Sequence, residues 1–75
     1  MDKEFNMDRE DINRCIEVVR KILIKKEINV SEDVLEKMTK NIMNISYAKG
    51  GDYSSKIIQS YAETYIEEKF YEKFL

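Results

Sequence analysis

The chain has 75 residues, no histidine, one cysteine and a net charge of −2 at neutral pH. The single cysteine excludes an internal disulfide, and the lack of histidine excludes Cys/His zinc sites as well as Ser-His and Cys-His nucleophile pairs. A chain this short is one domain that buries only about 60% of the surface of its unfolded form, so it has little interior in which to tune a catalytic carboxylate. We therefore expect a non-enzymatic protein without metal or cofactor, supported by oligomerisation.

Hydropathy and residue usage bear on location and origin. No apolar run approaches the roughly 18 residues that cross a bilayer, and the start lacks the pattern of a signal peptide. We predict a cytoplasmic protein with no membrane partner. Heavy use of Lys, Ile, Asn and Tyr, with no Pro and no Trp, is typical of AT-rich genomes and suggests a phage or mobile element as the source.

The first helix is predicted from about residue 9 to 26, after a short lead-in at residues 1–7. Asp8 is placed to cap its N-terminus through the side chain. Glu17 and Lys21 lie four residues apart on the polar face and are expected to pair. The apolar residues recur at helical spacing and form one face: Ile12, Cys15, Ile16, Val18, Val19, Ile22 and Leu23.

A second helix is predicted over residues 32–49, beyond a break at residues 27–30. Ser31 is a favourable N-cap, and Gly50 follows the last apolar position as the residue expected to stop the helix in a left-handed conformation. The apolar face consists of Val34, Leu35, Met38, Ile42 and Ile45.

A third helix is predicted from Ser54, its N-cap, to residue 74. The stretch from Tyr53 to Leu75 holds six of the eight aromatic residues of the chain. Two adjacent rows at four-residue spacing give it a broad apolar band. One row is Ile58, Ala62, Ile66, Phe70 and Phe74, and the other is Ile57, Tyr61 and Tyr65. Short connections bring the three apolar faces together, so the fold class is an all-α three-helix domain.

The aromatic band extends further than two short helices can cover, so part of it is predicted to be an interface. Aromatic side chains with a polar end are enriched at such surfaces. The predicted interface residues are Tyr61, Tyr65, Phe70, Tyr71, Phe74 and Leu75. The leading hypothesis is a protein–protein interaction module, a regulator or inhibitor that docks on a larger protein and forms a homodimer through the third helix.

The alternative hypothesis is a small dimeric DNA-binding repressor. Sequence-independent binding to DNA is mainly neutralisation of phosphates, and the basic residues concentrate in one segment: Arg14, Arg20, Lys21, Lys25 and Lys26. A short strand at residues 24–30, followed by two capped helices, resembles in outline the ribbon-helix-helix repressors over residues 24–70. The net acidic charge places this hypothesis second.

Other residues with reactive or ligating side chains are better explained structurally. Cys15 lies on an apolar face with no histidine to activate it, so we expect a small buried hydrophobe. The acidic clusters lack the spacing of a calcium loop and are expected to be solvated; they are Asp8/Glu10/Asp11, Glu32/Asp33 and Glu63/Glu67/Glu68.

Overall fold

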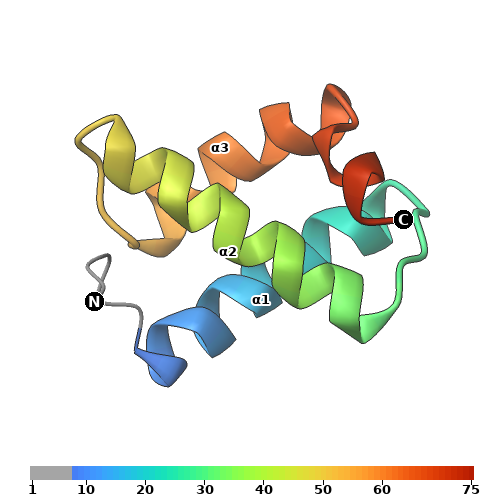
Figure 1. Ribbon diagram of the computed structural model, residues 1–75, viewed down its shortest axis with the longest axis horizontal. Coiled ribbons are helices and arrows are strands. Elements are labelled where there is room, and N and C mark those ends of the chain that lie inside the picture. Colours follow the sequence, from blue (N-terminus) through green and yellow to red (C-terminus); the bar gives the residue numbers. More distant parts are fainter. Residues whose placement is uncertain (1–7) are drawn as a thin grey trace.

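The structure is a computed structural model that describes residues 8–75, so the predicted lead-in lies outside the described residues. It contains three α-helices and a short 3-10 helix: α1 (Arg9–Lys25), α2 (Glu32–Ala48), α3 (Ser55–Glu67) and η1 (Phe70–Phe74) (Figure 1). The all-α three-helix prediction is confirmed. Residues 8–75 contain no strand, so the short strand that the DNA-binding alternative requires at residues 24–30 is absent; α1 continues to Lys25 instead.

Helix α1 has the predicted bounds to within one residue, but its N-terminus lacks the predicted side-chain cap. Asp8 has the extended backbone of an N-cap, but its side chain makes no capping hydrogen bond. At the other end, the amides of Glu27 and Ile28 donate to the carbonyls of Ile24 (3.0 Å) and Leu23 (2.9 Å). This is a Schellman motif, with Glu27 in the left-handed region at φ 60°. The helix therefore stops sharply without a glycine.

Helix α2 has the ends that the sequence predicts. The Ser31 hydroxyl oxygen accepts from the Val34 amide at 3.1 Å. After Ala48 the chain turns through Gly50, at φ 85°, and the Gly51 amide donates to the Ser46 carbonyl at 2.8 Å. Both predicted signals are confirmed, because each satisfies backbone groups that a helix end leaves unpaired.

Helix α3 is shorter than predicted. It ends at Glu67, and Lys69 takes a left-handed conformation with φ 63°. A left-handed residue breaks the repeating backbone geometry and redirects the chain. The last residues consequently do not continue the α3 axis; they form η1, which packs against α2 and α3.

The three helices pack against one another around one core. Its buried apolar residues come from every element: Ile12, Cys15, Ile16, Val19, Ile22, Leu23, Val34, Leu35, Met38, Ile42, Met43, Ile58, Ala62, Tyr65, Ile66 and Tyr71. The longest axis of the molecule separates two ends (Figure 1). The α2–α3 connection lies at one, and the α1–α2 connection and the C-terminus lie at the other.

Candidate functional site

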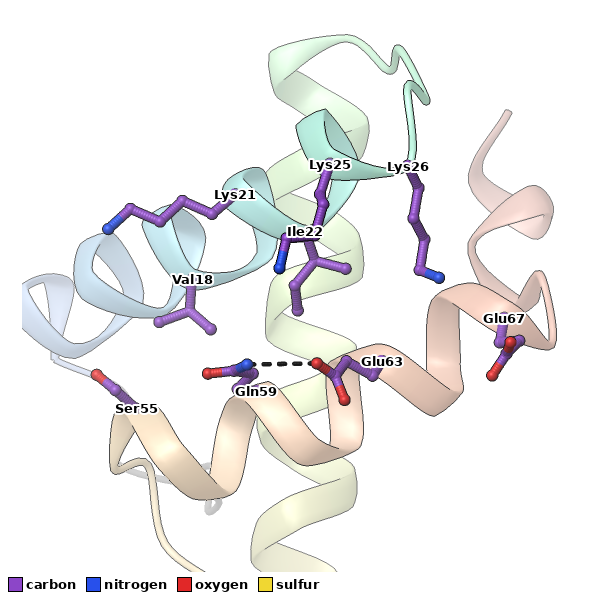
Figure 2. Close-up of a pocket in the computed structure, with 9 residues that line it drawn as sticks. All are labelled: Val18, Lys21, Ile22, Lys25, Lys26, Ser55, Gln59, Glu63 and Glu67. Atoms are coloured by element: carbon purple, nitrogen blue, oxygen red, sulfur yellow. Dashed lines mark hydrogen bonds between the residues drawn. The ribbon is translucent and has the colours of Figure 1, made fainter.

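A groove of about 750 Å³ lies between α1 and α3 (Figure 2). The side from α1 is formed by Val18, Lys21, Ile22 and Lys25, continued by Lys26. The side from α3 is formed by Ser55, Gln59, Glu63 and Glu67.

Helical spacing explains how each wall is built. The four residues from α3 follow one another at intervals of four, so they form a single row along the helix. On α1, Lys21 and Lys25 form one such row, and Val18 and Ile22 form the neighbouring one. Ile22 is buried and Val18 partly buried, and both point toward α3 in Figure 2. The groove thus has an apolar floor with a basic wall and an acidic wall.

The charged side chains of the two walls are not paired with each other. The sequence predicts an ion pair between Lys21 and Glu17, and the structure does not contain it. The Glu17 carboxylate instead accepts from Arg20 Nε at 3.3 Å. Within residues 8–75, the lysines of the groove form no ion pair. On the acidic wall, Glu63 accepts from Gln59 Nε2 at 3.3 Å. The groove therefore presents opposite charges on its two sides.

The structure divides the predicted basic segment into two groups. Arg14 donates to the Tyr53 carbonyl at 2.6 Å and to Asp11 at 2.9 Å. Arg20 donates to both carboxylate oxygens of Glu32, at 2.9 and 3.2 Å. The two arginines are therefore engaged in holding the fold, and the three lysines alone face the groove.

The structure also separates the six predicted interface residues. Tyr65 and Tyr71 are only 3% and 7% exposed, so within the single chain both belong to the core, and Tyr71 is not exposed as the sequence predicts. Tyr61 and Phe74 are partly buried against the core. Phe70 and Leu75 remain exposed, at 52% and 75%. Tyr65 is buried on α3 itself, whereas Tyr71 is buried because the turn at Lys69 folds η1 back against α2 and α3.

Tyr65 is a structural residue with a polar end. Its hydroxyl donates to Asn41 Oδ1 at 2.6 Å, and its ring packs edge-to-face with the ring of Phe70, with centroids 5.6 Å apart. Burial raises the pKa of Tyr65 to about 12, because a phenolate is poorly solvated inside a protein. Tyr65 thus ties α3 to α2.

Sequence reasoning missed the groove residues on α3. Glu63 and Glu67 were interpreted as a solvated cluster, and neither Ser55 nor Gln59 was assigned a role. The signal was present as a polar row at four-residue spacing beside the apolar band. It could be interpreted only once α1 was known to lie opposite.

Cys15 is fully buried, and its Sγ donates to the Tyr53 carbonyl at 3.7 Å. Burial raises the pKa of the thiol, which lowers the fraction of reactive thiolate. Cys15 therefore packs as a small hydrophobe. Among residues 8–75 there is no group of three His, Cys, Asp or Glu side chains arranged to hold a metal ion.

The described helices include none that is both long and apolar enough to span a bilayer. No family model matches the sequence, and no curated protein or solved structure shows a significant match to it.

Proposed function

We propose that this protein is a non-enzymatic interaction module, a small regulator or inhibitor that docks on a larger protein through the groove between α1 and α3. The observation that carries the proposal is the arrangement of Lys21, Lys25 and Lys26 opposite Glu63 and Glu67, over an apolar floor. Charges around an apolar centre give protein interfaces their orientation and selectivity.

A protein partner is favoured over nucleic acid by the same arrangement. A nucleic-acid backbone carries negative charge along its whole length, so Glu63 and Glu67 oppose its entry into the groove. Arg14 and Arg20 already bind groups of the chain itself. The strand on which the ribbon-helix-helix outline depended is also missing from residues 24–30.

Affinity capture from the native host tests the proposal. We compare the unaltered chain with the groove variant Lys21→Glu with Lys25→Glu. The matched control is Lys37→Glu with Lys49→Glu, which changes the net charge equally at exposed positions of α2 and its C-cap. We expect the unaltered chain and the control to capture the same protein and the groove variant to lose it. Equal capture by all three overturns the groove as the docking site.

The homodimer remains a prediction and now concerns a smaller surface. Phe70 and Leu75 are the exposed large apolar residues of the C-terminal segment, since the turn at Lys69 places Tyr71 in the core. A small apolar patch of this kind favours only weak pairing. Light scattering over a concentration series tests it. A mass that rises with concentration, and rises less for Phe70→Ala with Leu75→Ala, supports pairing; a monomer mass throughout contradicts it.

A further inference from the structure

We propose that the segment occupying the groove is an amphipathic helix of the partner, with an apolar stripe flanked by acidic residues on one side and basic residues on the other. This inference rests on the proposed function and adds the chemistry of the partner. It follows from the floor and the two walls taken together. Each of the three makes a separate demand on the occupant.

The floor demands an apolar stripe of limited width. Val18 and Ile22 follow each other at one helical turn on α1, and both point into the space between the helices in Figure 2. A volume of about 750 Å³ lies within the usual range of binding pockets. It accommodates side chains from one face of a helix and not its whole cross-section, which is about 10–12 Å wide.

The walls demand opposite charges on the two flanks. Lys21 and Lys25 require carboxylates on their side, and Glu63 and Glu67 require ammonium or guanidinium groups on theirs. Within residues 8–75 the lysines have no competing ion pair. Among the described residues Glu67 likewise has no ion pair, and Glu63 accepts a hydrogen bond only from the neutral Gln59. These charges are therefore available to a partner without first breaking an ion pair within residues 8–75.

A helix satisfies all three demands at once. Its stripe and both flanks face a groove together, because residues three and four apart lie side by side on its surface. An extended strand turns alternate side chains to opposite faces, so it presents one row to the floor and leaves the flanks poorly filled. Docking of an amphipathic helix into a groove is an established mode of peptide recognition.

Two synthetic peptides of identical composition test the charge pattern. Both carry a leucine stripe and are held helical by a bridge on the outer face. One has all its glutamates on one flank and all its lysines on the other, and the second alternates them on both flanks. In an NMR titration of the full chain, we expect the segregated peptide to shift the amide signals of Val18, Ile22 and Gln59. It should bind about tenfold more tightly than the alternating peptide.

Charge reversal of one wall supplies an independent readout. Lys21→Glu with Lys25→Glu makes both walls acidic. We expect it to weaken the segregated peptide at least about tenfold and to strengthen a peptide with lysines on both flanks. The control Lys37→Glu with Lys49→Glu should bind like the unaltered chain. The NMR spectrum of each variant shows whether the fold is retained.

Three results would overturn the inference: equal affinity for the segregated and alternating peptides, no change on reversal of the basic wall, or tighter binding of a duplex DNA oligonucleotide at the groove. Failure of the inference is distinguishable from failure of the proposed function. If the segregated peptide does not bind while host capture still depends on Lys21 and Lys25, only the helix pattern is wrong. If capture ignores those lysines, the docking site itself is wrong.

Discussion

The two long sides of α3 have opposite roles. One side carries Ile58, Tyr65 and Ile66, which are buried and account for its conspicuous apolar pattern. The other carries Gln59, Glu63 and other polar residues and faces α1 across the groove. The apolar side, which is the more conspicuous in the sequence, is used mainly for packing. The polar side, which has the composition of ordinary solvent-exposed surface, lines the candidate site. In a small domain, the residues of a strong hydrophobic pattern are therefore better interpreted as core than as a surface that binds a partner.

The largest expected effect comes from truncating the packed side. Ile58 is fully buried, so Ile58→Ala should lower the free energy of unfolding by about 2–5 kcal/mol. Gln59→Ala, its neighbour on the groove side, should change it by less than about 0.5 kcal/mol. Urea unfolding measures both. If Ile58→Ala does not fold, Ile58→Val keeps the comparison, with an expected loss of about 0.5–1.5 kcal/mol. Equal effects at the two positions would contradict the division.

A second test uses the hydroxyl on the packed side. Tyr65→Phe removes the hydrogen bond to Asn41 and should cost about 1 kcal/mol at neutral pH. The folded pKa of about 12 lies above the ordinary value near 10. The neutral phenol therefore stabilises the fold fully below pH 10, and this contribution is lost as the pH rises toward 12.

The difference between the unaltered chain and Tyr65→Phe should accordingly shrink over pH 10–12. Thermal unfolding of both proteins, measured in parallel, isolates this residue from the other groups that titrate in the same range. A difference that stays constant over this range would show that Tyr65 ionises at its ordinary pKa.

On α1 the comparison is between an arginine and a lysine. Arg14 donates to the Tyr53 carbonyl at 2.6 Å, and its side chain is 42% exposed. Arg14→Ala should lower the free energy of unfolding by about 1 kcal/mol, since exposure weakens a charged hydrogen bond. Lys21→Ala should leave stability within about 0.5 kcal/mol while weakening partner capture. An equal loss of stability at Lys21 would show that the fold uses the lysine as well.

The smallest expected effect lies where α3 ends. Lys69 has φ 63°, a conformation that is unfavourable for any residue with a Cβ. Lys69→Gly should raise the free energy of unfolding by about 0.5 kcal/mol, because relief of strain exceeds the added entropy of the unfolded glycine. Gly50→Ala is the opposite control. It should destabilise by about 1 kcal/mol from backbone strain alone, since an added Cβ meets no atom within 4 Å.

These residues also show how much of the molecule the sequence could predict. The positions of α1 and α2 were predicted because amphipathic spacing and recognisable end signals agree, as at Ser31 and Gly50. The end of α3 was missed because Lys69 performs a role that glycine usually marks. With that turn unrecognised, Tyr71 was placed on the surface, although it is buried.

The groove was out of reach for a different reason. Lys21 and Glu63 are far apart in the sequence, and each belongs to a row that is unremarkable on a solvated helix. Their arrangement on opposite walls depends on how the three helices pack. The sequence contained both rows of charge and gave no means of relating them.

The burial of Cys15 has a kinetic consequence. Its thiol is covered, and its hydrogen bond goes to the Tyr53 carbonyl in the connection between α2 and α3. An alkylating reagent can reach the sulfur when this connection moves away from α1 or when the whole chain unfolds. An alkylation rate faster than the rate of global unfolding therefore reports local opening of that connection. Cys15 is therefore a built-in probe of local opening at the end of the molecule opposite its C-terminus.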